Sequence, residues 1–364
     1  MIKVLVVDDS ALMRRLLANI FRSQTDFEVA IARDGIEGLA KVHEFQPDVM
    51  TLDVHMPNMD GLACLDRIML ERPTRVIMLS SLTEEGADET FEAMQLGAVD
   101  FLPKPDGAIS LAIDDLAPVL IEKVRSAYRQ RLRTTRGLTE RLRLRAAQGS
   151  VGQAVSKPVA INPSAPPHVR RSGPADGVVL VGASTGGPPA LDALLSPLTA
   201  TFPWPIIIAQ HMPASFTGPL ARRLDRLCAL NVHEVVRPEP LVPGHVYIGK
   251  GEADIIVVTR GEEPLVTAAP PLAEHRWHPS VDRLVATAMQ HLGSRRLVGV
   301  LLTGMGNDGA TAMTKLRSEG GRTIAESEDT AVVWGMPGEL VKAGGAELIA
   351  PMDKIASHLS DWAR

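Results

Sequence analysis

Short apolar runs alternate with longer amphipathic segments along the first hundred residues of the chain. Runs rich in β-branched side chains predict strands at residues 3–7, 29–32, 49–52, 76–79 and 99–102. Between them, apolar positions recur with a helical period at residues 12–21, 35–45, 62–70 and 87–96. Such alternation predicts a parallel sheet with helices on both faces, in which ligands bind at the carboxyl ends of the strands.

The same alternation returns in the second half of the chain. Strands are predicted at residues 178–181 and 206–209 and near Val246, Ile255 and Val298, with helices starting near Pro188, Phe216 and Asp308. Between the halves, an amphipathic helix from Ser110 runs into an Arg-rich stretch and a Pro-containing stretch with little apolar pattern, which is typical of a linker.

The predicted fold class is therefore α/β, with two doubly wound parallel-sheet domains joined by a flexible basic linker. The amino-terminal domain is a (βα)5 unit at residues 1–125, the linker spans residues 126–172, and a Rossmann-like domain spans residues 173–364. A length of 364 residues suits two domains that each bury a core of their own.

Composition and charge narrow the class of protein. Apolar residues at 45% and charged residues at 22% are close to globular averages, which excludes global disorder and fibrous repeats. The net charge of −5 hides an asymmetry, because residues 1–109 carry 10 Lys/Arg against 19 Asp/Glu, whereas residues 122–171 carry 12 against 2. An acidic chain is a poor nucleic-acid binder, so we expect no nucleic-acid partner. The basic stretch meets an acidic protein surface or, as we favour, is a solvated tether.

The length of the apolar runs and the positions of the two cysteines indicate in which cellular compartment the protein works. Runs such as residues 205–209 are far shorter than the ~18 residues of a membrane span, and residues 1–7 lead directly into Asp8 and Asp9. We therefore expect neither a signal peptide nor membrane insertion. Cys64 and Cys228 fall in different predicted domains, which argues against a disulfide framework and a cysteine metal site. The expected location is the cytoplasm.

Acidic residues mark the strand ends of the first predicted domain. Asp8 and Asp9 follow the first strand and Asp53 follows the third. Those strands are neighbours in a doubly wound sheet, so the three carboxylates should converge. Such oxygen ligands suit Mg²⁺, which keeps several waters for an incoming phosphate. Asp9 and Asp53 are its expected protein ligands.

Two further strand ends carry residues of a phosphoryl site. Ser80 ends the fourth strand, and Lys104 follows the fifth and offers a point charge for phosphate. Taken singly, each aspartate could cap a turn or helix and Lys104 could be an ordinary loop residue. Together the set resembles the receiver domains of two-component response regulators. This resemblance implies that Asp53 accepts phosphate from a histidine kinase, and that Ser80 and Phe101 occupy switch positions.

A Gly-rich turn opens the second predicted domain. The strand at residues 178–181 leads into Gly182-Ala-Ser-Thr-Gly-Gly187, and Pro188 opens the following helix, which places Ser184 on a tight strand-to-helix bend. Backbone amides and the helix dipole at such a bend would stabilise an oxyanion. The same turn could equally bind an anion without chemistry, so the G-x-S-x-G pattern alone leaves both readings open.

A histidine and an aspartate at other strand ends supply what a nucleophilic serine needs. His211 ends the strand after Ser184, and Asp308 follows a later strand. An activated serine requires a base within hydrogen-bond reach and an acid that orients the base. The alternatives are a histidine bonded to backbone and an aspartate that caps a helix.

The order Ser184, His211, Asp308 differs from that of α/β-hydrolases. With Gln210-His-Met-Pro213, Pro279-Ser-Val-Asp282 and Thr303-Gly-Met-Gly-Asn-Asp-Gly309, the chain resembles the chemotaxis protein-glutamate methylesterases of the CheB type. The resemblance implies Ser184 as nucleophile, His211 as base and Asp308 as its orienter. Thr185, Gly186 and Met305 would lie near the oxyanion and substrate.

The resemblance also implies a reaction and partners. It is the hydrolysis of glutamate γ-methyl esters on chemotaxis receptors with release of methanol, together with deamidation of receptor glutamines, without a cofactor for the hydrolysis. A receiver in front would make the enzyme phosphorylation-activated, with Mg²⁺ needed for phosphorylation. A non-catalytic phospho-switch is an alternative. A DNA-binding regulator is disfavoured, because the effector half shows neither a helix-turn-helix pattern nor a basic stripe.

One segment fits neither set of motifs. His275 and His278 have the i, i+3 spacing of a metal-binding pair, but no third ligand accompanies them. A place on the substrate rim or the surface is the favoured reading, and no metal is expected in the second domain.

Overall fold

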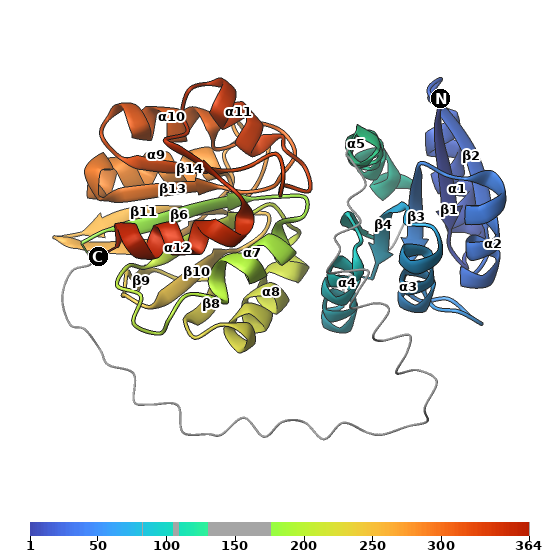
Figure 1. The fold of residues 1–364 in the computed structure, drawn as a ribbon, viewed down its shortest axis with the longest axis horizontal. Coiled ribbons are helices and arrows are strands. Elements are labelled where there is room, and N and C mark those ends of the chain that lie inside the picture. The colour runs from blue at the N-terminus through green and yellow to red at the C-terminus, as the bar shows by residue number, and fades with distance from the viewer. Residues whose placement is uncertain (82, 105–108, 130–175, 364) are drawn as a thin grey trace, which may run out of the picture.

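Two α/β domains form the part of the chain that the computed structural model describes, namely residues 1–81, 83–104, 109–129 and 176–363 (Figure 1). The predicted domain boundary at residue 125 falls inside the last helix of the first domain, which ends at Arg129. Most of the linker predicted at residues 126–172 lies outside the described residues.

The first domain has a five-stranded parallel sheet in the order β2-β1-β3-β4-β5, as the alternating pattern predicts. The strands are β1 (Ile2–Val7), β2 (Phe27–Ala32), β3 (Val49–Asp53), β4 (Arg75–Ser80) and β5 (Asp100–Pro103). The helices are α1 (Ala11–Arg22), α2 (Gly35–Phe45), α3 (Gly61–Glu71), α4 (Glu84–Leu96) and α5 (Ile109–Arg129). The order makes β1 and β3 neighbours, so the residues that follow them share one edge of the sheet.

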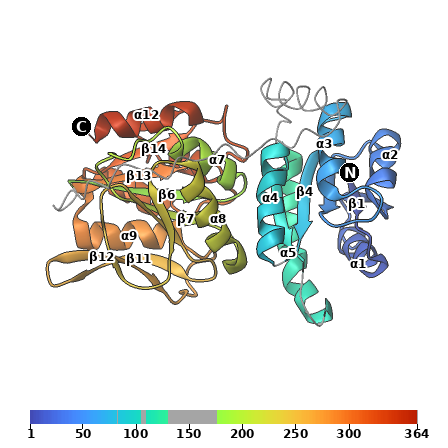
Figure 2. The same ribbon diagram turned by 90° about the horizontal axis from the view of Figure 1, so that it is seen from below.

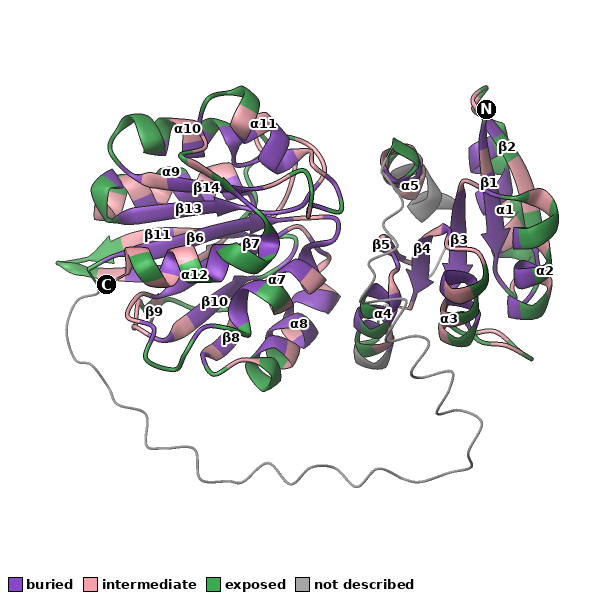
Figure 3. Ribbon diagram, in the orientation of Figure 1, coloured by how far each residue is buried: buried purple, intermediate pink, exposed green. Residues whose placement is uncertain are grey.

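Polar residues at the turns start the helices of this domain. The side chains of Ser10, Asp34, Asp60 and Thr83 each accept a hydrogen bond from the backbone N–H three residues later, which satisfies a donor that the helix itself leaves open. The central strand β3 is buried along its whole length, as Figure 3 shows by its purple colour. The functional edge of the sheet is therefore built on a rigid core.

The second domain has a seven-stranded sheet in the order β15-β14-β13-β6-β7-β10-β8, with parallel pairing throughout. Its strands are β6 (Val178–Ala183), β7 (Ile206–Gln210), β8 (Asn231–Val235), β10 (His245–Gly249), β13 (Leu297–Leu301), β14 (Arg322–Glu326) and β15 (Leu348–Ala350). Its helices are α7 (Gly187–Leu195), α8 (Ala214–Leu227), α9 (Val281–Leu292), α10 (Ala310–Ser318), α11 (Met336–Lys342) and α12 (Met352–Trp362). The prediction of a second parallel-sheet α/β domain is confirmed.

One predicted strand lies outside this sheet. Ile255 belongs to β11 (Asp254–Arg260), which pairs antiparallel with β12 (Glu263–Ala269), and β12 pairs with the short β9 (Glu239–Pro240). A strand of a hairpin and a strand of a βα unit have the same kind of run of β-branched residues. The run alone therefore did not show which of the two Ile255 belongs to. This small sheet packs against α9, whose first residues belong to the site described below.

The two domains dock mainly through α4 of the first and α7 and α8 of the second, which lie side by side in both views (Figure 1, Figure 2). The ring of Phe216 on α8 lies 4.6 Å from that of Phe101 on β5 and 6.4 Å from that of Phe91 on α4, measured between centroids. All three rings are buried. No helix in the described ranges is long and apolar enough to cross a membrane.

Candidate active site and phosphorylation site

Three adjacent strands of the second domain end in the predicted catalytic residues. Ser184 follows β6, His211 follows β7, and Asp308 lies in the loop after β13. In the sheet, β6 lies between β13 and β7, so the serine is flanked by the strands that carry its two partners. The structure therefore brings to one edge three residues that are far apart in the sequence.

The turn that carries Ser184 runs directly into the amino-terminal end of a helix. Gly186 adopts a left-handed conformation with φ of 78°, and α7 begins at the next residue. The Ser184 N–H donates to the Thr303 carbonyl at 3.0 Å, and the Gly187 N–H donates to the Ser184 carbonyl at 2.8 Å. Within the described residues, the N–H groups of Thr185 and Gly186 have no acceptor. These two amides lie at the positive end of a helix, where they suit a developing negative charge.

The Asp308 carboxylate is held by several donors at once. One oxygen accepts a hydrogen bond from His211 Nε2 at 2.8 Å and from the Val281 N–H at 2.7 Å. The other accepts from Ser280 Oγ at 3.1 Å and from the Asp282 N–H at 3.0 Å. Burial raises the pKa of Asp308, but these hydrogen bonds outweigh burial and hold the pKa below its ordinary value. Asp308 is therefore a fixed anion, and it does not cap α10, which starts after Gly309 without a side-chain cap.

The second ring nitrogen of the histidine is left for the serine. His211 Nδ1 is buried and makes no hydrogen bond in the described parts of the chain, and no hydrogen bond joins the Ser184 hydroxyl to His211 there. Such bonds are often long in proteins without substrate and tighten on binding. Since Nε2 is engaged by Asp308, Nδ1 is the nitrogen that can take the Ser184 proton.

Side chains to which the sequence analysis assigned no role support the turn. Thr303 Oγ1 donates to the Thr185 carbonyl at 2.9 Å and accepts from the Val333 N–H at 2.9 Å. Gln210 Nε2 donates to the Ser184 carbonyl at 3.0 Å. Both are almost fully buried. Their roles depend on contacts between distant segments, which periodicity does not report.

The histidine pair lies beside the catalytic loops. His278 Nδ1 lies 2.9 Å from Asp254 Oδ1, whereas His275 Nε2 lies 3.7 Å from Glu274 Oε1. The two histidines thus have separate acidic partners. Of the residues that the structure describes, the only carboxylate, histidine or cysteine group close enough to hold a metal ion is that of Asp8, Asp9 and Asp53.

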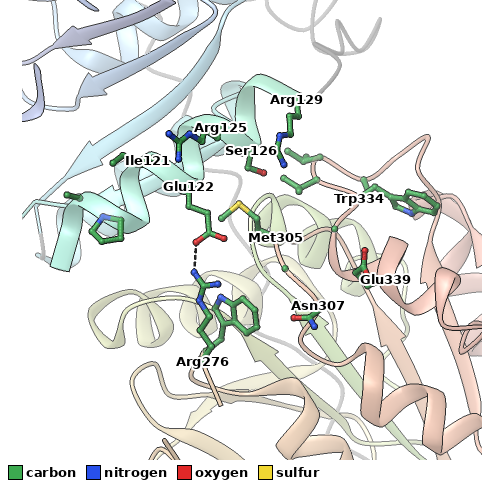
Figure 4. Close-up of a pocket in the computed structure, with 18 of the residues that line it drawn as sticks. Ile121, Glu122, Arg125, Ser126, Arg129, Arg276, Met305, Asn307, Trp334 and Glu339 are labelled. Atoms are coloured by element: carbon green, nitrogen blue, oxygen red, sulfur yellow. Dashed lines mark hydrogen bonds and ion pairs between the residues drawn. The ribbon is translucent and has the colours of Figure 1, made fainter. Parts of the chain in front are cut away.

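A cleft of about 1500 Å³ separates α5 of the first domain from the loops around the catalytic residues (Figure 4). Met305 lines this cleft on the side of the second domain, and the side chains of Glu122 on α5 and Arg276 form an ion pair across it at 2.6 Å. The predicted oxyanion neighbour Met305 is thus placed where the two domains face each other.

The first domain also reaches the residue next to Ser184. Thr185 Oγ1 donates to Asp100 Oδ2 on β5 at 2.6 Å, and Lys123 of α5 pairs with the same carboxylate oxygen. Thr185 and Asp100 are both buried. The docked domain therefore covers one side of the serine turn and binds it directly.

The acidic cluster of the first domain forms as predicted from the strand ends. Asp8, Asp9 and Asp53 each offer an oxygen atom within 4.8 Å of the others. Lys104 Nζ lies 2.9 Å from Asp8 Oδ2 and 2.7 Å from Asp53 Oδ2. Burial raises the pKa of Asp53 to about 6, against the opposing effect of Lys104. Three hard oxygens in this arrangement are consistent with a Mg²⁺ site.

The two predicted switch residues lie between the acidic cluster and the domain contact. Ser80 Oγ donates to the Gly86 carbonyl in the first turn of α4 at 2.9 Å. Phe101 packs against Phe216 of the other domain. A change at Asp53 that moved Ser80 or Phe101 would therefore act on α4 and on the docking surface.

Comparisons with known proteins agree with both halves of this arrangement. Residues 4–113 match the family model of the response regulator receiver domain. Residues 179–359 match the family model of the CheB methylesterase. Each model covers one of the two domains.

Relatives cover the chain from end to end. A protein-glutamate methylesterase/protein-glutamine glutaminase of Rhodopseudomonas palustris is 53% identical over 364 residues, which is 100% of this chain and 98% of that protein. One of Rhodospirillum rubrum is 49% identical over 362 residues, 100% of this chain and 96% of that protein. The crystal structure of the Thermotoga maritima CheB methylesterase catalytic domain superposes with a TM-score of 0.50 at 35% identity, over 51% of this chain and 98% of that one.

Proposed function

The chain belongs to the CheB family, the protein-glutamate methylesterase/protein-glutamine glutaminases controlled by a response-regulator domain, and we propose that Ser184, His211 and Asp308 are its catalytic residues. The observation that carries this assignment is the saturated carboxylate of Asp308. With four donors around it, it stays charged and fixes Nε2 of His211. The opposite ring nitrogen is thereby available to the serine.

The proposed reaction proceeds through an acyl-serine. His211 takes the Ser184 proton while Oγ attacks the γ-carbonyl carbon of the ester or amide. The carbonyl oxygen becomes an oxyanion, which the N–H groups of Thr185 and Gly186 stabilise. His211 then gives the proton to the leaving methoxide or amide, so methanol or ammonia departs. Water attacks the acyl-serine by the same route and releases glutamate and Ser184. The hydrolysis needs no cofactor.

The first domain is proposed to accept the controlling phosphoryl group at Asp53 from a histidine kinase. Asp9 and Asp53, beside Asp8, would hold Mg²⁺, which when bound offsets the negative charge of an incoming phosphate. Lys104 is already within 2.7 Å of Asp53 and would bind a phosphate oxygen. The pKa of Asp53, raised by burial, reflects a carboxylate that few donors engage.

Docking of the first domain is proposed to hold the enzyme in a resting state. Thr185 is bound by Asp100 and the cleft beside Met305 is walled by α5, so an extended polypeptide has restricted access to Ser184. An aspartyl phosphate that moves Ser80 and Phe101 would weaken the aromatic contact with the second domain and shift the population towards an open form.

Chemotaxis receptors are the proposed substrates, because the family acts on glutamate methyl esters and glutamines of proteins. The cytoplasm is the proposed location, where a histidine kinase would supply the phosphoryl group. Neither a nucleic acid nor membrane insertion has a part in this proposal.

A methanol-release assay on methylated receptor membranes tests the proposal. The full chain should release methanol, and a small phosphodonor with Mg²⁺ should accelerate the release. Membranes whose receptors carry no methyl esters are the control. Absence of methanol from methylated membranes, with or without phosphodonor, would overturn the substrate assignment.

A further inference from the structure

An indole ring lies parallel to the imidazole of the proposed catalytic base, in an offset stack. The rings of Trp277 and His211 are stacked with an angle of 2° between their planes and 5.7 Å between their centroids. Trp277 belongs to the segment between β12 and α9 that holds His275 and His278. None of these three side chains takes part in the catalytic steps above.

The indole is held from several sides. A Cβ on Gly306 would lie 2.6 Å from Trp277 Cζ2, so the ring packs directly on the backbone of a glycine that has φ of 87°. The guanidinium carbon of Arg276, the residue before Trp277, lies 5.2 Å from the centroid of the indole ring. A residue larger than glycine at position 306 would therefore collide with the Trp277 ring.

The backbone after Trp277 is fixed by a buried carboxylate. Asp254 has no exposed surface and accepts hydrogen bonds from the Ser280 N–H at 2.8 Å and from Arg283 at 2.6 Å. It also pairs with His278 Nδ1 at 2.9 Å. Burial raises the pKa of Asp254, but these bonds lower it below its ordinary value, so the anchor is an anion. The Trp277 ring is thus mounted on a rigid segment.

The hydrogen bonds of the catalytic imidazole in the described residues do not by themselves fix the plane of the ring. Its hydrogen bond to Asp308 holds Nε2 at one point, about which the ring can still rotate, and Nδ1 has no partner in the described residues. A stacked aromatic ring removes that freedom without occupying either nitrogen. A base whose orientation drifts loses catalytic efficiency steeply, since a displacement of about 1 Å can cost a hundredfold in rate.

We propose that Trp277 is a positioning residue for the catalytic base: its stacked indole sets the plane of the His211 imidazole so that Nδ1 meets the Ser184 hydroxyl. The inference rests on the proposed function, in which His211 is the base. It adds a residue that touches the base and not the reacting atoms. Its effect should therefore appear in turnover and not in substrate affinity.

The kinetic test compares variants of the full chain on methylated receptor membranes with saturating phosphodonor. Trp277→Leu, which keeps an apolar side chain and removes the aromatic face, should lower kcat about ten- to a hundredfold with KM within about twofold. Trp277→Phe should restore kcat to within about fivefold of the parent. Trp362→Leu removes another indole that also faces a guanidinium, that of Arg322, and should leave both constants unchanged.

A spectroscopic test follows the stack itself. With ¹³C-labelled histidine, the His211 ring resonance should show the ring-current shift of a stacked indole, should lose it in Trp277→Leu, and should keep it in Trp362→Leu. A kcat of Trp277→Leu equal to the parent, a higher KM at unchanged kcat, or an unmoved resonance would each overturn the inference. Those outcomes leave the proposed function intact. An active Ser184→Ala protein would instead overturn the proposed function, and the resonance would still report the stack.

Discussion

Asp53 and Asp308 are carboxylates at strand ends with nearly the same burial, but their pKa values are shifted in opposite directions. Their exposed fractions are 3% and 4%. Burial raises the pKa of Asp53 to about 6, whereas the pKa of Asp308 lies below its ordinary value in spite of burial. Desolvation is therefore not what separates the two sites.

The two sites differ in the hydrogen-bond donors that surround each carboxylate. Asp53 has Lys104 and a long hydrogen bond from the His55 N–H at 3.4 Å, with the negative Asp8 beside it. Asp308 has four donors, three of which belong to the start of α9. An underbound carboxylate can still gain a metal ion or a phosphoryl group, whereas a saturated one can only orient its neighbour. In the proposed function, the chain thus uses the same residue type as a phosphoryl acceptor in one domain and as a fixed anion in the other.

Removing the nucleophile should separate the two sites most completely. Ser184→Ala should lower methanol release at least about 10⁴-fold, because the proposed acyl-enzyme forms on Ser184 Oγ. Phosphorylation of Asp53 should continue, since its ligands lie in the other domain. Radiolabelled phosphodonor and methanol release measure the two activities on one sample. A variant with activity within tenfold of the parent would contradict the assignment of Ser184.

Neutralising the saturated carboxylate should have the next largest effect. Asp308→Asn keeps the size of the side chain but removes the charge that holds the His211 tautomer, so kcat should fall about 10³- to 10⁴-fold. Asp282→Asn changes a carboxylate in the first turn of α9, the helix whose start contacts Asp308, and as the matched control it should lose far less. Similar losses in both variants, measured as methanol release, would show that the helix start and not the anion is what matters.

The pH profile should report the base and not Asp308. A lowered folded-state pKa means that Asp308 contributes stability above its unfolded pKa, and that this contribution is lost only as the pH falls through the lower folded value. Asp308 thus stays charged between pH 5 and 8. His211 must be neutral to act as a base, so kcat/KM should fall as the pH drops and the imidazole takes up a proton, while the charge of Asp308 stays constant. A flat profile in a protein that stays folded by circular dichroism would contradict the role of His211.

Weakening the contact between the domains should have the smallest effect. Asp100→Asn removes the charge that Thr185 and Lys123 share, which should raise the activity without phosphodonor about three- to tenfold, as expected for one buried hydrogen bond of about 1 kcal/mol. Glu71→Gln changes a carboxylate of the first domain that pairs with Arg67 on α3, away from the contact, and should leave the resting rate unchanged. An unchanged or lower resting rate in Asp100→Asn would count against inhibition by docking.

The alternation of apolar runs and amphipathic segments predicted most of the strands and helices. Strand ends in a parallel sheet share one edge, so the same pattern predicted where polar residues of distant segments would gather. That rule placed Asp53, Ser184 and His211 at strand ends, and the family resemblance supplied their expected roles. The rule failed at Ile255, whose apolar run belongs to an antiparallel hairpin, since residues of a strand carry no record of their partner's direction.

The pattern of apolar and polar positions did not predict contacts between segments that are remote in the sequence. The amides of α9 that hold Asp308 come from a motif about 26 residues upstream, where Ser280 reads locally as a helix cap, and it does cap α9. The stack of Trp277 on His211 and the contact of Thr185 with Asp100 join segments that only the folded chain brings together. A sequence predicts which residue types are available at an edge, whereas packing decides which of them meet.

The coupling of the two carboxylate sites can be measured at Ser184 itself. A fluorophosphonate probe that reacts with activated serines, mapped by mass spectrometry, should label Ser184 of the full chain slowly at rest and several times faster with Mg²⁺ and phosphodonor. In Asp53→Asn the phosphodonor should have no effect on the rate. Labelling of Ser184 at equal rates in all of these samples, or acceleration that survives in Asp53→Asn, would contradict control of the serine through Asp53.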